Sequence, residues 1–248
     1  MSTSQWARAW HITAKDIRTY YLKPPLISWG MLFPLVMILA FAVRSPGDMR
    51  GTMPGLVGMT ALFGATSVEA VAIAFEKRIG AMERLVMAPL TPHALLIGKT
   101  ASGALFGTAT GALVWLISTA AYGLSFGAGL PLLVIALSSV CFALLGVLVS
   151  LLMREVFDAM TFSNVFRFPM IFLGGVFVPL VRMAPPLRWI ASALPLTYAV
   201  DALRHLTLAG EGAWYPFWSD WAVLLAFGAA LYAASLWLLE RRLEDLID

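Results

Sequence analysis

The sequence is short of charged residues, histidine and cysteine. Only 12% of its 248 residues are charged and 60% are hydrophobic, whereas about a quarter of an average soluble domain is charged. A soluble domain of this size must expose many polar residues, so the composition excludes a soluble enzyme and a disordered chain. The net charge of +3 is too small for a nucleic-acid-binding surface, and the lone Cys141 excludes an intrachain disulfide. An integral membrane protein remains.

Long uncharged runs supply the spans that such a protein needs. About 20 helical residues cross the hydrocarbon core, and residues 100–153 carry no charge over 54 positions, with glycines and Pro131 dividing them into two helices. Lipid offers backbone groups no partner, so each span must be helical. We predict an all-α membrane protein, a single domain over 1–248, with six transmembrane helices at about 26–43, 54–75, 100–121, 131–153, 159–181 and 221–239.

The distribution of basic residues predicts the orientation. If the N-terminus is cytoplasmic, twelve of the 17 Lys and Arg residues lie inside and five lie outside. Cytoplasmic loops carry the excess of Lys and Arg in membrane proteins. We therefore expect both termini in the cytoplasm.

Residues 4–22 predict an N-terminal amphipathic helix in the membrane interface. Apolar and basic residues recur at three- and four-residue steps on opposite faces, which is typical of a helix whose aromatic rings lie at headgroup depth. The alternative is a solvated helix with no role beyond anchoring. The two faces are Trp6, Trp10, Ala14, Ile17 and Tyr21 against Arg8, His11, Lys15 and Arg18.

The connection between the second and third spans, residues 76–90, is both charged and apolar. Ile79, Met82 and Leu85 share one helical face, and glycine and proline interrupt the segment. Two interpretations stay open. The stripe docks into a groove of a soluble partner, or it folds back on the base of the bundle.

A partial nucleotide-binding motif follows. Gly98-Lys99-Thr100 matches the end of a phosphate-binding loop, but His93 stands where the motif has its first glycine, and no strand precedes it. We expect Lys99 to snorkel to the cytoplasmic end of the third span instead.

The segment 182–220 contains two short apolar helices, at 187–193 and 196–208, with Gly210 as a stop. Neither is long enough to span. We predict a re-entrant helical hairpin between spans five and six, which requires protein or a water-filled cavity around its broken backbone.

Two charges fall inside predicted spans. Glu69 and Arg167 lie roughly 10 Å and 13 Å from the cytoplasmic boundary at about 1.5 Å per residue. Their similar depth suggests a compensating pair, and the alternative is that each snorkels or faces a wet cavity independently.

These motifs resemble a known family. Glu76-x-x-x-Gly80-x-x-Glu83-x-Leu85-x-x-x-Pro89, followed by Gly98-Lys99, resembles the cytoplasmic signature of ABC-2 type transporter permeases, which include drug, nodulation-factor and O-antigen exporters. Leu194-Pro195-Leu196-Thr197-Tyr198, with Asp201 and Arg204, resembles their second motif.

The resemblance implies the permease subunit of an ATP-binding-cassette exporter in a bacterial or archaeal inner membrane, carrying an amphipathic drug, lipid or lipid-linked glycan. It implies two permease copies, expected as a homodimer, and two separate ATPase subunits that bind ATP and Mg²⁺. No catalytic residue, metal, cofactor or nucleic acid is expected on this chain. The implied coupling residues are Glu76, Arg78, Gly80, Met82, Glu83, Arg84, Leu85, Pro89 and Leu90, and the hairpin residues are Pro195, Tyr198, Asp201 and Arg204.

Two other classes of membrane protein predict different sequence features. An ion-coupled secondary transporter predicts inverted repeats and charges at the midplane of the membrane. An intramembrane enzyme needs paired acids, a Ser/His set or metal ligands within the spans, and His11, His93 and His205 lie outside them.

Overall fold

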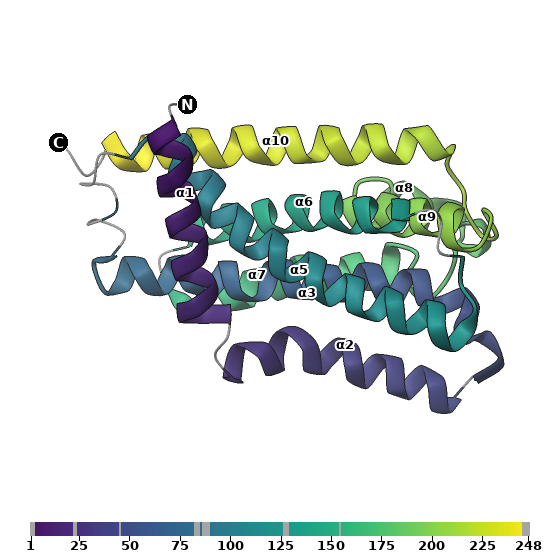
Figure 1. Cartoon of the computed structure of the whole chain (residues 1–248). Coiled ribbons are helices and arrows are strands. Elements are labelled where there is room, and N and C mark those ends of the chain that lie inside the picture. The colour runs from purple at the N-terminus through teal and green to yellow at the C-terminus, as the bar shows by residue number, and fades with distance from the viewer. Residues whose placement is uncertain are drawn as a thin grey trace.

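A computed structural model describes residues 3–21, 24–44, 46–81, 85, 90–125, 129–153 and 155–244, and this part of the chain is helical with no strand. The long helices run side by side, and α1 crosses one end of the bundle, close to both termini (Figure 1). The elements are α1 (Thr3–Asp16), η1 (Ile17–Tyr21), α2 (Pro24–Arg44), η2 (Pro46–Asp48), α3 (Met49–Arg78), α5 (Pro92–Tyr122), α6 (Leu130–Leu152), α7 (Val156–Leu173), η4 (Leu180–Arg182), α8 (Pro185–Ala191), α9 (Pro195–Thr207) and α10 (Phe217–Glu244).

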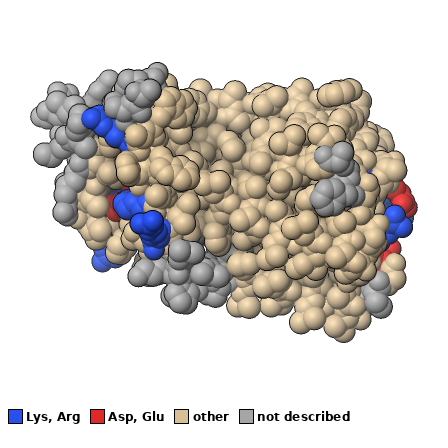
Figure 2. Space-filling model, in the orientation of Figure 1, with Lys and Arg blue, Asp and Glu red and all other residues tan. Residues whose placement is uncertain are grey.

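Five helices of the described chain are long and apolar enough to cross a membrane: α3, α5, α6, α7 and α10. They correspond to five of the six predicted spans. The remaining prediction, 26–43, falls on α2, in which the apolar stretch Met31–Arg44 is shorter. Figure 2 shows charged side chains gathered at the two ends of the visible face and a broad uncharged belt between them.

Two helices differ in extent from the spans predicted on them, for identifiable reasons. The helix α5 begins at Pro92, before the predicted span start at residue 100, because Thr91 caps it by accepting the N–H of Ala94 at 3.2 Å. The helix α7 ends at Leu173, before the predicted span end at residue 181. Beyond it the backbone of Val176 runs against α3, where a Cβ on Gly55 would lie only 2.3 Å from its carbonyl oxygen.

The central helix is α3, which packs against α2, α5, α6, α7 and α9. A stripe of glycines on α5 allows the closest approach. A Cβ on Gly107 would lie 2.7 Å from the Ala65 Cβ, and one on Gly103 would lie 2.8 Å from the Ala65 carbonyl oxygen. Small residues let helix backbones meet in this way, so the stripe packs within the chain.

The segment 182–220 contains the short helices α8 and α9, which overlap the predicted 187–193 and 196–208 and lie at the end of the bundle away from α1 (Figure 1). Nearly every side chain of α9 is buried, against α3, α6, α7 and α10. The helix α9 is therefore surrounded by protein rather than exposed at the surface of the bundle.

Candidate functional site at the junction of α1 with the spans

The helix α1 lies on α5 through a face that the sequence pattern did not reveal. Ala9, Ile12 and Thr13 are buried, and Thr13 donates its hydroxyl to the Gly98 carbonyl oxygen at 3.0 Å. A Cβ on Gly98 would lie 2.9 Å from the Ala9 carbonyl oxygen, so only glycine admits this approach. The predicted helix over 4–22 is α-helical to Asp16 and then forms a π-helical turn.

The aromatic face of α1 points away from the protein. Trp6 and Trp10 are 55% and 62% exposed, while Arg8 is half-buried and Lys15 and Arg18 are exposed. Exposed indoles beside a buried face are typical of a helix that is fixed to its protein on one side and reaches lipid headgroups on another.

Four charged side chains meet beneath the C-terminal end of α1. We call Lys15, Asp16, Glu76 and Lys99 the junction network. Lys99 Nζ lies 2.5 Å from Glu76 Oε2 and 2.8 Å from Asp16 Oδ2. Lys15 Nζ lies 2.5 Å from Glu76 Oε1 and 2.7 Å from Asp16 Oδ1. Each cation therefore bridges both carboxylates, and the four formal charges cancel.

The junction network is buried except at Lys15. The side chains of Asp16 and Glu76 are 1% exposed and that of Lys99 is 2% exposed, whereas Lys15 is 41% exposed. Lys99 thus does not snorkel as predicted, because two carboxylates meet it inside the bundle. Burial lowers the pKa of Lys15, but hydrogen bonds and charge from Asp16 and Glu76 outweigh it, so the pKa lies above its usual value.

A second polar layer continues the junction network into the bundle. Glu69 accepts hydrogen bonds from the Tyr21 and Ser102 hydroxyls, both at 2.7 Å. Tyr20 donates its hydroxyl to Glu76 Oε1 at 3.3 Å, and burial together with the Glu76 charge raises the pKa of Tyr20 to about 12. The turn η1 therefore contacts both acids of α3, Glu69 and Glu76, which lie about two helical turns apart.

The suggested pair between Glu69 and Arg167 does not form. Arg167 donates Nε–H to the Thr66 hydroxyl at 2.7 Å and an Nη1–H to the Asn164 carbonyl oxygen at 3.2 Å, and its guanidinium lies over the Phe63 ring. No ion pair within 4 Å joins Arg167 to an acid in the described chain. Each charge is held by neutral polar groups on neighbouring helices instead.

The segment 76–90 begins at the junction network, and its described leucines pack on the bundle. Glu76 lies in the last turns of α3 and faces inward, Arg78 and Ile79 are exposed, and Gly80 ends the helix with φ of 66°. Leu85 and Leu90 are half-buried against the bundle's own cluster around Ile73, Leu95 and Leu96. Met82, Glu83, Arg84, Val86 and Pro89 lie outside the described residues.

Lys77 adds a further connection at this end. Its Nζ donates to the Ser150 carbonyl oxygen at 2.6 Å and contacts those of Leu151 and Met153, at the C-terminal end of α6. A cation is favourable at these carbonyl groups, which have no partner within the helix.

The partial phosphate-loop motif does not form a phosphate-binding loop. Gly98-Lys99-Thr100 lies within the helix α5, and the Lys99 amine is ion-paired with two acids.

The predicted hairpin residues stabilise the opposite end. Pro195 starts α9, and Tyr198 donates its hydroxyl to the Ser192 carbonyl oxygen at 2.7 Å, joining the two short helices. Asp201 accepts the backbone N–H of Tyr215 at 2.8 Å. Arg204 is buried and donates to the carbonyl oxygens of Gly51 and Gly175 at 3.0 and 3.2 Å.

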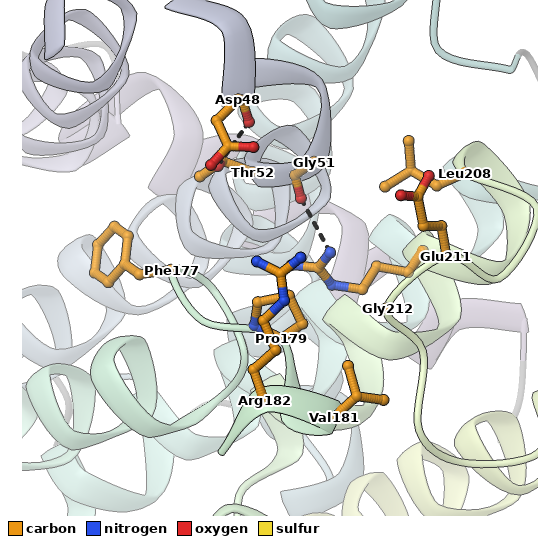
Figure 3. A pocket seen from close by; sticks show the side chains of 11 residues that line it. Asp48, Gly51, Thr52, Phe177, Pro179, Val181, Arg182, Leu208, Glu211 and Gly212 are labelled. Atoms are coloured by element: carbon orange, nitrogen blue, oxygen red, sulfur yellow. Dashed lines mark hydrogen bonds between the residues drawn. The ribbon is translucent and has the colours of Figure 1, made fainter. Parts of the chain in front are cut away.

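Arg204 and Arg182 line a pocket of about 200 Å³ at this end. Figure 3 shows Asp48 at the end of η2, and Gly51 and Thr52 at the start of α3, opposite Pro179 and Arg182 across this pocket. The hairpin is therefore linked through Arg204 to the start of the central helix.

Sequence reasoning missed Asp16, Lys99, Tyr21 and Ser102 as members of the site. The sequence did contain a signal for the charged members. Opposite charges occur at the predicted cytoplasmic ends of two spans, as Glu76 and Lys99, and at the end of the amphipathic helix, as Asp16. Periodicity does not show which of them meet, because that depends on how each helix is rotated.

These features define a polytopic helical membrane protein, with an amphipathic helix buried on one side at one end and a buried helix pair at the other. The chain belongs to the ABC-2 type transporter family, which it matches over residues 8–208. It is 26% identical over 250 residues to "Inner membrane transport permease YadH" of Escherichia coli K12, covering 95% of this chain and 96% of the relative. It is 26% identical over 189 residues to "Probable multidrug ABC transporter permease YbhR" of the same strain, covering 73% of this chain and 50% of that protein.

The family and the apolar helices establish the general role. The chain is an integral inner-membrane protein and the membrane subunit of an ABC transporter, a class that works with an ATPase subunit.

Proposed function

We propose that this chain is the permease subunit of an ABC exporter. Two copies form the translocation path, and two ATPase subunits on the cytoplasmic side bind ATP with Mg²⁺ and drive it. In this proposal α2 is the first of six spans, both termini are cytoplasmic, and α8 and α9 form a re-entrant hairpin on the outer side. ATP binding by separate subunits is supported by the helical, ion-paired setting of Lys99.

The junction network is the observation that carries the coupling proposal. The segment 76–90 joins the end of α3 to the start of α5, and the junction network connects those same two helices to α1. A displacement of the segment by a partner would therefore move three elements as one unit. Packed helices with two discrete arrangements are how such local movements reach a distant gate.

The substrate proposal is an amphipathic drug, a lipid or a lipid-linked glycan. It is supported by the uncharged belt of the molecule, because a substrate that enters from or leaves to lipid meets an apolar surface there (Figure 2). The name of the relative YbhR, which refers to multidrug transport, favours the drug among these classes.

Cysteine labelling tests the orientation. Ile79 and Trp189 are exposed, 49% and 79%, at opposite ends of the bundle, and the native Cys141 is buried. In cells, Trp189→Cys should react with a membrane-impermeant maleimide and Ile79→Cys should not, while inverted vesicles should show the reverse. The opposite pattern would refute the orientation.

Copurification tests the coupling segment. The double change Glu83→Ala/Leu85→Ala should reduce recovery of a coexpressed partner ATPase subunit, and reduce ATP-dependent transport in proteoliposomes. Leu187→Ala, an exposed leucine on α8, is the matched control and should leave recovery unchanged. Undiminished association and transport in the double variant would remove the coupling assignment.

A further inference from the structure

Three ligand-type side chains converge where α9 meets the start of α10. Asp201 and His205 lie four residues apart on one face of α9, and Asp220 lies in the first turn of α10. One carboxylate oxygen from each aspartate and one ring nitrogen of His205 all lie within 4.8 Å of one another. This group lies at the end of the bundle away from the junction network and shares no residue with it.

Asp220 is the unexplained member of the group. Its side chain is fully buried, and neither carboxylate oxygen has a hydrogen-bond partner. Asp201 is also fully buried, but it accepts backbone N–H groups from Trp214 and Tyr215. Two carboxylates therefore converge in a protected space, and a buried charge is tolerated only when it is paired or coordinates a metal.

In the part of the chain that the structure describes, no ion pair within 4 Å reaches Asp201 or Asp220. Arg204 and His205 act on Asp201 by their charge, but the Arg204 guanidinium donates its hydrogen bonds to Gly51 and Gly175 on other elements. Asp220 therefore has no basic partner in direct contact. A proton held by the carboxylates or a bound cation would compensate the charge that remains.

The spacing and the ligand types favour a cation. Ligands on opposite sides of an ion, with bonds of about 2.1–2.4 Å, lie about 4.2–4.8 Å apart, so the three groups need little movement to meet one ion. A second feature agrees, because His205 Nε2 donates its proton to the Tyr215 carbonyl oxygen at 2.8 Å, which leaves the lone pair of Nδ1 as the ligand for an ion. Metal-ligating histidines are typically oriented by such a contact.

We propose that Asp201, His205 and Asp220 bind one divalent cation. Two carboxylates and one imidazole suit Mn²⁺ or Zn²⁺ rather than a soft, thiolate-bound metal. The ion joins α9 to α10 and so fastens the short helix pair to the last span. This inference depends on the fold alone and stands apart from the direction of transport and from the ATPase partner.

Metal binding to the full-length protein tests the site. The protein is purified in detergent without a polyhistidine tag, stripped with EDTA, dialysed against metal-free buffer and titrated with Mn²⁺ or Zn²⁺. Bound metal is counted by mass spectrometry, Mn²⁺ is followed by electron paramagnetic resonance, and thermal unfolding is recorded with and without EDTA. We expect one ion per chain and a higher unfolding temperature in the metal-loaded protein.

Variants assign the ion to this site. Asp220→Asn should weaken Mn²⁺ and Zn²⁺ binding at least tenfold and abolish the metal-dependent shift in unfolding temperature. Asp158→Asn changes an exposed acid on α7 and should bind metal as the native chain does. His205→Gln provides a second, milder change should Asp220→Asn fail to fold.

Two outcomes would overturn the proposal. One is that the native protein shows no saturable binding and the same unfolding temperature in EDTA and in metal. The other is that the native protein binds an ion which Asp220→Asn and His205→Gln retain with full affinity. An Asp220→Asn variant as stable as the native chain in EDTA, with no metal effect on either, would identify a shared proton instead.

Discussion

Removing Lys99 should break the junction network, and the size of the effect follows from its burial. Lys99 is 2% exposed and contacts two acids that are each 1% exposed. In Lys99→Met, the apolar stem keeps its packing, but two buried carboxylates remain with one cation, Lys15, that is 41% exposed. Leaving a buried charge uncompensated costs about 3–5 kcal/mol, which is roughly two to four powers of ten in the folding equilibrium.

The comparison variants separate burial from charge alone. Lys15→Met removes the same formal charge from a site that water reaches, so we expect a loss of about 1 kcal/mol or less. Lys99→Met/Glu76→Gln leaves one cation and one acid, Lys15 and Asp16, whose 2.7 Å contact remains possible. The double change should therefore cost less than the sum of its single changes, with a coupling of about 0.5–3 kcal/mol.

The assay is reversible unfolding of the purified protein in mixed micelles, followed by far-ultraviolet circular dichroism. The free energy of unfolding is compared under one detergent composition across five proteins: the native chain, Lys99→Met, Lys15→Met, Glu76→Gln and Lys99→Met/Glu76→Gln. Equal losses for Lys99→Met and Lys15→Met, or strictly additive losses in the double variant, would show that the four charges do not act as a buried unit. The explanation given for coupling α1 to α3 and α5 would then fail.

Three further predictions concern packing and buried hydrogen bonds, each measured by the same unfolding experiment. Gly107→Ala should destabilise by about 1–3 kcal/mol, because its Cβ would overlap α3, whereas Gly51→Ala, with open space around its Cβ, should be neutral or slightly stabilising. Tyr21→Phe should cost about 1–3 kcal/mol, because it leaves buried Glu69 with a single hydroxyl donor; a neutral result would argue against that bond. Arg204→Lys should lose about 1.5–3 kcal/mol, because an ammonium does not reproduce the fork between two carbonyl groups, and full stability would contradict this.

Composition and run length were sufficient to predict most of the membrane architecture. The bilayer acts on contiguous residues: a run of about 20 apolar side chains spans it whatever its neighbours do. For that reason the spans at 131–153 and 221–239 were predicted close to α6 and α10. The break between the two helices of the long uncharged run was also predictable from its glycines, since Gly123 and Gly129 adopt positive φ where the run divides.

Helix ends differ from the predicted spans where a tertiary contact decides them. The predicted third span begins at residue 100, after Lys99, yet α5 begins at Pro92, because the junction network stabilises a buried lysine inside the helix. The predicted fifth span extends to residue 181, yet α7 ends at Leu173, because the backbone after it packs against Gly55 on another helix.

The sequence alone determined that this is a helical membrane protein, with an amphipathic segment at one end and two short helices near the other. Only the tertiary structure decided which polar groups meet. Lys15 and Glu76 are 61 residues apart, and Arg167 finds Thr66 rather than the equally deep Glu69. The depth of a residue in the bilayer follows from its position along one helix. Which polar side chains contact each other depends on how the helices are rotated and on close approaches such as that at Gly107, and both arise only when the helices pack.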